Sequence, residues 1–242
     1  MSQQSQDALL DPVAAYDALA PCYRMYSQTR LPYLQAVERL ITARITGARS
    51  LLDVGAGDGS RAMRIAKSAG IGETVLVEPS EGMRRHGMTA GEIWNCRASA
   101  IPQSTRRFDV VVCLWNVLGH IQGHAERQAL LVRLKDLLTP SGSLFLDVNH
   151  RYNAAAYGWP MTFLRQVRDF FLWSERNGDV VVRWKTHDQT IRTRGHVFTQ
   201  VELNGLFCAA SLKIQRRWIV NYQTGAEHRL SLLGNLLYQL NV

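Results

Sequence analysis

The sequence lacks the cysteine spacings that are typical of metal sites and redox motifs. Its four cysteines lie far apart, and no two of them form a CxxC pair. They are Cys22, Cys96, Cys113 and Cys208. This spacing predicts reduced thiols in the core or in a pocket, and no metal site is expected.

The sequence also lacks a secretory signal and a membrane-spanning segment. Residues 1–7 (MSQQSQD) contain neither the basic region nor the apolar stretch of a signal peptide. No charge-free apolar run approaches the length that crosses a bilayer. We therefore expect a cytoplasmic protein without a membrane partner.

No internal repeat or low-complexity tract is present in the 242 residues, of which 46% are hydrophobic and 20% charged. This composition is typical of a globular protein that buries a sizeable core. The formal net charge of +8 favours an anionic partner such as nucleic acid, an acidic lipid surface or an acidic metabolite. Charge alone identifies no partner, because a solvated surface rich in arginine explains it equally well.

Hydrophobic periodicity divides the chain into four regions. Helical spacing predicts an N-terminal helical lid at residues 1–46. Strands and helices then alternate, which predicts an α/β core with a parallel sheet and helices on both faces at residues 47–150. Residues 151–198 are rich in arginine and aromatics and contain two paired strands, so we interpret them as an inserted α+β lid that binds substrate. Residues 199–242 are expected to complete the core sheet.

Short apolar runs mark the strands of the core. They lie at residues 50–54, 74–77, 93–96, 108–115 and 143–148. An amphipathic helix is expected from residue 124 to 138, and the sequence TPSG at 139–142 is predicted to end it. Ligands of such sheets bind at the carboxyl ends of the strands, so functional residues are expected there.

The turn after the first strand carries three glycines, Gly55, Gly57 and Gly59. Glycine lets the backbone approach a ligand closely at the N-terminus of the following helix. The spacing is GxGxG and differs from the GxGxxG of nicotinamide dinucleotide binders. Two carboxylates, Asp53 and Asp58, flank the glycines and would repel a pyrophosphate. The turn therefore favours a cationic ligand without phosphate.

Glu78 ends the second strand, about 20 residues beyond the glycines, where an acidic side chain typically receives ribose hydroxyls. A carboxylate accepts two hydrogen bonds at once, which suits a vicinal diol. The turn and the glutamate together predict a nucleoside with a positive charge. S-Adenosylmethionine fits, because it carries a sulfonium and an ammonium and no phosphate, and Asp53 could help to hold its amino group.

The order of these motifs resembles that of the class I S-adenosylmethionine-dependent methyltransferases, and more loosely their small-molecule branch with methyltransferase type 11 or 12 domains. The similarity covers about residues 11–150. It rests on residues 16–20 (YDALA), 51–59 (LLDVGAGDG), 77–80 (VEPS) with Met83, 108–112 (FDVVV) and 137–142 (LLTPSG). The resemblance implies a Rossmann-like sheet of seven strands, the last of them antiparallel, and methyl transfer to a small molecule.

The resemblance also implies which residues hold the cofactor. They are Tyr23, Asp53, Gly55, Ala56, Gly57, Glu78, Pro79, Met83, Ala98, Ser99, Leu114 and Trp115. The chain departs from the family at Arg97, which stands where an acidic residue often contacts the adenine amino group. We therefore expect the backbone around Ala98 to contact the adenine.

Candidates for catalysis follow the fourth and fifth strands. Methyl transfer from a sulfonium mainly needs alignment, and a general base is needed only if the acceptor is protonated. Asn116 and His120 follow the fourth strand and His150 follows the fifth. Either histidine could act as a base, since imidazole titrates near neutral pH. Either could equally cap a helix or bond to the backbone.

Candidates for acceptor binding are Tyr16, Asn149, Arg151, Tyr152 and Arg192. Arginine binds carboxylate or phosphate through its bidentate fork, so these residues predict an acidic or aromatic metabolite. The methylated atom, oxygen, nitrogen or carbon, is left open. Tyr16 and Tyr23 could also simply pack the N-terminal helix onto the sheet. The protein is expected to be a monomer or a homodimer.

Three other functions fit parts of the sequence. A methyltransferase acting on RNA or another nucleic acid would suit the net charge and aromatic residues that stack a flipped base. Residues 114–117 (LWNV) lack the Asn/Asp-Pro-Pro-Tyr/Phe and Pro-Cys motifs of such enzymes, so nucleic acid is not expected as a partner. A catalytically silent regulatory protein that binds S-adenosylmethionine would show the same cofactor motifs, and a nicotinamide oxidoreductase would share the fold.

Overall fold

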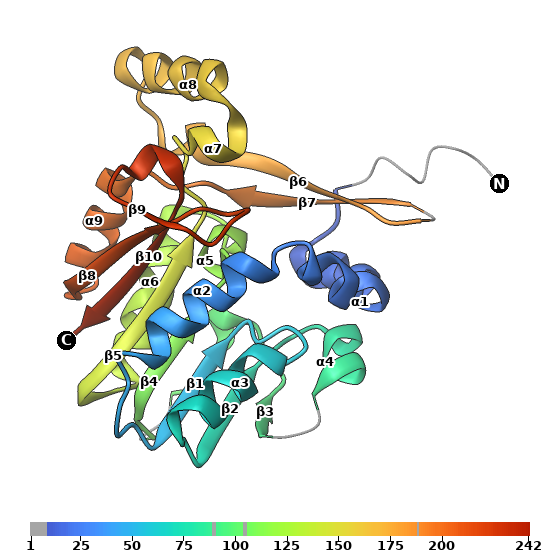
Figure 1. Cartoon of the computed structure of the whole chain (residues 1–242), viewed down its shortest axis with the longest axis vertical. Coiled ribbons are helices and arrows are strands. Elements are labelled where there is room, and N and C mark those ends of the chain that lie inside the picture. Colours follow the sequence, from blue (N-terminus) through green and yellow to red (C-terminus); the bar gives the residue numbers. More distant parts are fainter. Residues whose placement is uncertain (1–8, 89–90, 104–105, 188) are drawn as a thin grey trace.

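The computed structural model describes residues 9–88, 91–103, 106–187 and 189–242. Its main sheet has eight strands in the order β3-β2-β1-β4-β5-β10-β8-β9 (Figure 1). The strands are β1 (Ser50–Val54), β2 (Glu73–Val77), β3 (Glu92–Trp94), β4 (Phe108–Cys113), β5 (Leu138–Val148), β8 (Lys213–Val220), β9 (Glu227–His228) and β10 (Asn235–Asn241). The strands from β3 to β5 are parallel, and β10 runs antiparallel between β5 and β8.

The predicted Rossmann-like α/β sheet with an antiparallel last strand is therefore confirmed. Its described part has eight strands where seven were expected. The additional strand is the two-residue β9, which pairs with β8 at the edge. The sequence 139–142, expected to end a helix, lies inside β5 instead. Strand β5 pairs with β4 on both sides of this segment, at Phe108↔Leu138 and Val110↔Ser143, with a register shift between the two pairs.

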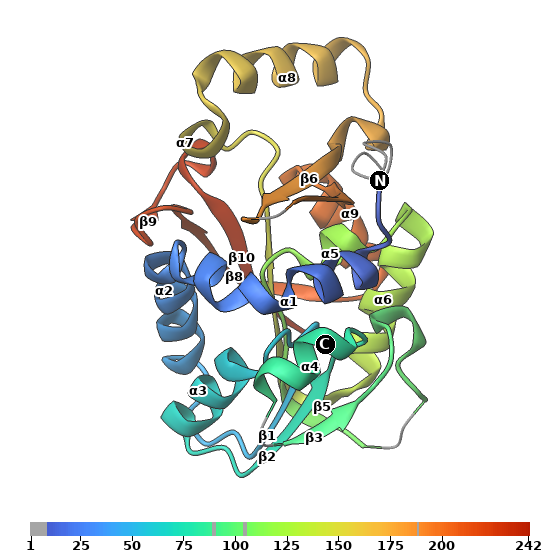
Figure 2. The ribbon, with the colours of Figure 1, turned by 90° about the vertical axis from the view of Figure 1, so that its right-hand side faces the viewer.

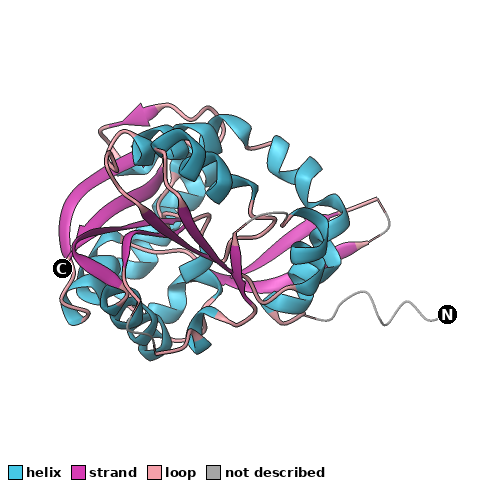
Figure 3. Ribbon diagram, turned by 90° about the horizontal axis from the view of Figure 1, so that it is seen from below, coloured by secondary structure: helices cyan, strands magenta, loops and turns pink. Residues whose placement is uncertain are grey.

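Helices cover both faces of the sheet (Figure 3). They are α1 (Pro12–Gln28), α2 (Leu31–Thr42), α3 (Ser60–Ala69), α4 (Glu81–Gly87), α5 (Val117–His120), α6 (His124–Asp136), α7 (Ala154–Tyr157), α8 (Trp159–Phe171) and α9 (Gln200–Ala209). One apolar cluster joins α2 and α3 to the sheet, and a second joins α6 and α9 to the other face. Every residue of β1 is buried, as expected for a strand covered on both sides.

The segment between β5 and α9 lies outside the main sheet. Its strands β6 (Asp179–Lys185) and β7 (Thr190–His196) form a separate antiparallel ribbon. The N-terminal segment packs against this ribbon, because the Leu10 amide donates to the Arg192 carbonyl over 2.9 Å. Leu19 of α1 shares a small apolar cluster with Trp184 and Ile191. Helix α1 and the ribbon are thereby brought together above the sheet (Figure 2).

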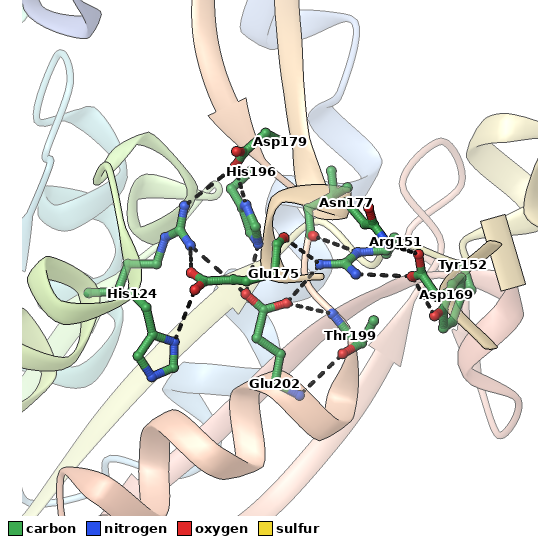
Figure 4. Close-up of polar contacts among 12 residues, drawn as sticks. His124, Arg151, Tyr152, Asp169, Glu175, Asn177, Asp179, His196, Thr199 and Glu202 are labelled. Atoms are coloured by element: carbon green, nitrogen blue, oxygen red, sulfur yellow. Dashed lines mark hydrogen bonds and ion pairs between the residues drawn. The ribbon is translucent and has the colours of Figure 1, made fainter. Parts of the chain in front are cut away.

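A buried ionic network ties this inserted segment to the core (Figure 4). Arg151 has no exposed surface, and its guanidinium lies 3.0 Å from Asp169 of α8 and 2.9 Å from Glu202 of α9. Nε2 of His196 lies 2.7 Å from the same Glu202, and its Nδ1 lies 2.8 Å from Asp179. Buried charges of this kind need partners on every side, so the network fixes how the insertion sits on the core.

Within the described ranges, no helix combines the length and the apolar character that crossing a bilayer requires. The same residues contain no cluster of three or more histidine, cysteine or acidic side chains arranged to hold a metal ion.

Candidate active site

Two neighbouring cavities lie at the carboxyl ends of the parallel strands. The first, of about 290 Å³, is lined by Gly55, Gly57 and Glu78, and we call it the glycine-turn cavity. The second, of about 270 Å³, is lined mainly by aromatic side chains, and we call it the aromatic cavity. Four side chains line both cavities, and they are Tyr16, Tyr23, Trp115 and His120. The two cavities therefore meet at these four residues.

The turn that forms the first cavity depends on glycine. Gly55 and Gly57 have φ values of 73° and 61°, in the left-handed region that glycine adopts without strain. A Cβ atom on Gly57 would lie 2.9 Å from the Tyr23 hydroxyl, and one on Gly55 would lie 2.5 Å from Val117. A side chain at either position would therefore overlap its neighbour, so the turn can lie this close to Val117 and Tyr23 only with glycine at both positions.

Glu78 lies against this turn with both carboxylate oxygens engaged. One oxygen accepts from the Gly57 amide and the other from the Ser80 amide, each over 2.8 Å. Burial raises the pKa of the Glu78 carboxyl to about 7, against the lowering effect of the two backbone donors. Glu78 also lines the cavity, where its remaining lone pairs can accept from hydroxyl groups.

Asp53 lies close to a cation of the same site. Its carboxylate is fully buried 3.8 Å from the Arg61 guanidinium, and neither of its oxygens has a hydrogen-bond donor among the described residues. Burial raises the pKa of Asp53 to about 6 although Arg61 opposes this. Arg61 lines the glycine-turn cavity, whereas Asp53 does not. Asp58, the other carboxylate of the turn, accepts from the amide and hydroxyl of Ser60 at the start of α3.

Helix α1 covers the cavity through polar contacts with the core. Asp11, which caps the start of α1, forms an ion pair with Arg97 over 2.8 Å, and both residues line the cavity. Asp17 accepts from the Ser80 hydroxyl over 2.6 Å and from the Gly82 amide over 2.8 Å. Arg97, which stands where the family often has an acidic residue in contact with adenine, therefore contacts the start of helix α1 instead.

Most of the residues expected at the cofactor line the glycine-turn cavity. Those that do are Tyr23, Gly55, Gly57, Glu78, Pro79, Ala98, Ser99, Leu114 and Trp115. Asp53, Ala56 and Met83 do not, and all three are buried beside it in the core. Sequence reasoning missed the lining residues that α1 with its N-cap, the α5–α6 connection and the first turn of α6 supply. These are Asp11, Pro12, Val13, Ile121, Gln122 and Glu126.

The aromatic cavity is built around Trp115. This residue and Asn116 each have a φ of 62°, which is rare for residues other than glycine and often marks a functional site. The Trp115 indole donates to the Tyr222 hydroxyl over 3.0 Å, and the Tyr26 ring stacks on the indole. Tyr157 and Trp184 complete the aromatic lining from the inserted segment.

Among the residues that the structure describes, Arg30 is the one formally charged residue that lines the aromatic cavity. Its guanidinium lies 4.7 Å from the centre of the Tyr222 ring. Its Nε atom is buried and has no acceptor among the described residues. The cavity thus combines aromatic rings and amide side chains with a cation whose hydrogen-bonding capacity is not used up. Arg30 was not among the residues expected from the sequence.

His120 occupies the junction of the two cavities. Its Nε2 lies 3.2 Å from the Tyr16 hydroxyl and its Nδ1 lies 3.2 Å from the Arg194 carbonyl oxygen. A carbonyl only accepts, so Nδ1 carries the proton in this arrangement and Nε2 is free to accept. Burial lowers the pKa of His120, which keeps the imidazole neutral. Asn116 lines the aromatic cavity and accepts from the Asn149 amide over 3.0 Å.

Four other candidates line neither cavity: His150, Arg151, Tyr152 and Arg192. His150 lies 2.8 Å from the Ser231 carbonyl, and burial lowers its pKa to about 4. Arg151 is neutralised in the ionic network, and Tyr152 donates to Asp169 of the same network over 2.7 Å (Figure 4). Of the acceptor candidates, the structure brings Tyr16 and Asn149 to the aromatic cavity.

Comparisons with known proteins agree with this architecture. A family model described as a methyltransferase domain matches residues 25–216. A comparison with curated proteins gave no match.

Several solved structures share the fold. An S-adenosylmethionine-dependent methyltransferase from Clostridium acetobutylicum is 11% identical, with a TM-score of 0.64 over 91% of this chain and 99% of that chain. An S-adenosylmethionine-bound amino pentose methyltransferase from Micromonospora echinaspora is 16% identical, with a TM-score of 0.61 over 91% of this chain and 97% of that chain. A Haloferax volcanii complex between the Trm112 methyltransferase activator and a methyltransferase gives 14% identity and a TM-score of 0.65 over 95% and 96%.

Proposed function

The chain belongs to the methyltransferase domain family, it is an enzyme that uses S-adenosylmethionine, and we propose that it methylates a small aromatic acceptor with an anionic group. The observation that carries this proposal is the aromatic cavity, which shares four lining residues with the glycine-turn cavity and has Arg30 as its only formal charge among the described residues. Aromatic side chains suit an aromatic ring, and a guanidinium suits a carboxylate.

The residues of the glycine-turn cavity fit this cofactor. The turn leaves a cradle that a Cβ atom at Gly57 would fill, and Glu78 faces the same space with capacity to accept from ribose hydroxyls. Arg61 lines this cavity and supplies a cation for the carboxylate of the cofactor's amino acid, and the buried Asp53 lies 3.8 Å from that guanidinium. When bound, S-adenosylmethionine supplies a methyl group that its sulfonium has already activated.

The residues at the junction of the cavities would align the acceptor and manage its proton. Trp115 separates the two spaces and lines both, so it can position an aromatic ring beside the cofactor. Nε2 of His120 accepts from the Tyr16 hydroxyl, and this pair can take a proton from an acceptor hydroxyl or amine. Helix α1, held by Asp11 and Asp17, covers the junction and excludes water.

The proposal is tested by turnover with matched acceptors. Hydroxybenzoates and aminobenzoates are incubated with isotopically labelled S-adenosylmethionine, alongside the corresponding carboxamides, and products are detected by mass spectrometry. We expect methylated products with a kcat/KM for the acids about tenfold or more above that of the amides, the usual worth of a charged hydrogen bond. Equal rates for acids and amides, or methylation of RNA alone, would overturn the proposed acceptor class.

A further inference from the structure

Helix α8 presents large apolar side chains to solvent. Phe163, Phe170 and Phe171 are 68%, 82% and 73% exposed. Further exposed apolar residues lie on the same helix or directly after it, namely Trp159, Met161, Leu164, Val167, Leu172 and Trp173. Contiguous apolar surface of this extent is rare on soluble monomers and usually marks a contact surface.

The apolar residues form one face of the helix. At about 100° per residue, six of them fall within an arc of about 140°. They are Trp159, Phe163, Leu164, Val167, Phe170 and Phe171. The two buried residues of α8, Thr162 and Asp169, lie on the opposite side and face the protein. The helix is therefore inverted relative to an ordinary surface helix, whose apolar side faces the core.

Ionic contacts hold α8 in this orientation. Asp169 lies 3.0 Å from Arg151, accepts from the Tyr152 hydroxyl over 2.7 Å and accepts from the Asn177 amide group over 2.9 Å (Figure 4). Arg168 donates to the Asn177 carbonyl over 2.7 Å. Turning the apolar face inward would break these buried contacts, and leaving a buried charge unpaired costs several kcal/mol. The outward face is thus specified by the fold.

The position of α8 limits what can cover it. The helix lies across one end of the longest axis, and no other element of the described chain extends as far in that direction (Figures 1 and 2). Two copies joined end to end would meet over a footprint of about 20 Å by about 10 Å, the size of one short helix. Stable dimers bury about 800 Å² on each partner. A flat surface, in contrast, can reach the whole apolar face without touching the rest of the protein.

The charges next to this face are positive. Arg168 and Arg176 are exposed, whereas Arg165 lies on the protein-facing side of α8 and donates to the Arg151 carbonyl over 2.9 Å. The one acidic residue of α8, Asp169, is buried and paired with Arg151. Glu175 is only partly exposed and pairs with Arg127 over 2.7 Å. An apolar helical face beside arginines is complementary to an anionic lipid surface.

We propose that α8 docks this protein onto the surface of an anionic lipid bilayer. The phenylalanines and Leu164 enter the boundary between headgroups and acyl chains, and the adjacent arginines contact lipid phosphates. Trp159 lies at the start of the apolar face and is 60% exposed, and tryptophan is favoured at membrane interfaces. This docking is independent of the proposed acceptor, because α8 contributes no residue to either cavity.

Vesicle sedimentation of the full chain tests the proposal. We expect binding to vesicles of phosphatidylcholine mixed with phosphatidylglycerol, and weaker binding to phosphatidylcholine alone. The double variant Phe163→Ser, Phe170→Ser should reduce binding by about tenfold or more, since each phenylalanine loses its transfer into the apolar layer. The matched control is Val201→Ser, Leu230→Ser, two apolar residues that are 75% and 64% exposed on other elements. This control should bind as the wild type does.

A second measurement needs no variant. Brominated phosphatidylcholine in the mixed vesicles should quench part of the wild-type tryptophan fluorescence, because Trp159 enters the lipid. Absence of binding and quenching, or equal binding by both double variants, would overturn the proposal. So would a solution dimer that Phe163→Ser, Phe170→Ser converts to a monomer, since α8 would then be a contact between copies.

Discussion

The hydroxyl of Tyr16 lies 3.2 Å from Nε2 of His120, at the point where the glycine-turn cavity and the aromatic cavity meet. Tyr16 comes from helix α1 and His120 from the short helix after β4. The contact therefore joins helix α1 to the core at the junction of the two cavities.

Replacing His120 by Ala should lower kcat by about a hundredfold if the acceptor is protonated, the lower end of what general base catalysis contributes. The affinity for S-adenosylmethionine should change little. Steady-state kinetics and calorimetry measure the two effects. His228→Ala serves as the control, because His228 lies on β9 and lines neither cavity. Wild-type kcat in His120→Ala would remove the base assignment.

Replacing Glu78 by Gln should weaken cofactor binding by about 1–3 kcal/mol, the cost of losing a charged hydrogen-bond acceptor. Calorimetric titration with S-adenosylhomocysteine at pH 8 measures this. Glu81→Gln, in the exposed first turn of α4, is the matched control. Unchanged affinity in Glu78→Gln would mean that the ribose is held elsewhere.

The contribution of Glu78 and Asp53 to the stability of the cofactor-free protein should decrease as the pH rises from about 4 to about 7. Burial raises the pKa of Glu78 from 4.5 to about 7 and that of Asp53 from 3.8 to about 6. In this window the two carboxyls bind more protons in the folded state than in the unfolded state, whereas His150, whose pKa burial lowers to about 4, contributes the opposite slope. Urea unfolding of the wild type and of Glu78→Gln at pH 5.5 and pH 8 isolates the contribution of Glu78. Between these pH values the wild type should lose more stability, or gain less, than the variant, and equal changes would contradict the shift.

Cofactor binding should show the opposite pH dependence. The ribose hydroxyls donate to the ionised form of Glu78, so affinity should be highest above pH 7 and should fall as Glu78 becomes protonated below that value. If the affinity of the wild type for the cofactor is constant across this range, Glu78 does not bind the ribose.

Replacing Arg30 by Met should lower kcat/KM for an anionic acceptor by about tenfold to a hundredfold, the worth of a charge-assisted hydrogen bond, and leave the uncharged analogue almost unaffected. The comparison of acid and amide in the same variant separates loss of the charge from general damage. Arg39→Met is the control, because Arg39 is exposed on α2 and lines neither cavity. Equal losses for both acceptors would show that Arg30 does not contact the anion.

Replacing Arg151 by Met should destabilise the fold by about 3–5 kcal/mol, because Asp169 and Glu202 would remain buried without their shared partner. Urea unfolding measures the loss. Arg168→Met removes an exposed partner of the same Asp169 and should cost less than about 1 kcal/mol. If the Arg151→Met protein is stable and its KM for the acceptor is raised, Arg151 contacts the acceptor instead.

Local patterns predicted the part of the site that one strand and one turn build. The apolar run of β1, the glycines after it and Glu78 at the end of β2 are close in sequence and adjacent in a parallel sheet. The kind of ligand that these residues suit could therefore be inferred from the sequence without the fold. Gly55 in particular cannot be replaced by another residue, since any side chain there would overlap Val117.

Other parts of the site depended on packing. Trp115 was expected to continue the fourth strand, yet β4 ends at Cys113 and the backbone of Trp115 turns into the left-handed region. Its amide donates to Asp147 at the end of β5, a neighbour that only the sheet order supplies. The lid residue Asp11 and its partner Arg97 are 86 residues apart.

The sequence by itself determined the fold class and the face of the sheet that holds the cofactor, because periodicity and glycine conformation act over a few residues. Only the tertiary structure decided which charged and aromatic groups are available. Arg151 is neutralised by residues 18 and 51 positions away, whereas Arg30 faces an aromatic cavity with its Nε atom unpaired. Helix α8 likewise faces outward because distant partners hold its polar side. Electrostatic pairing and burial arise from the whole packed chain, so no local pattern contains them.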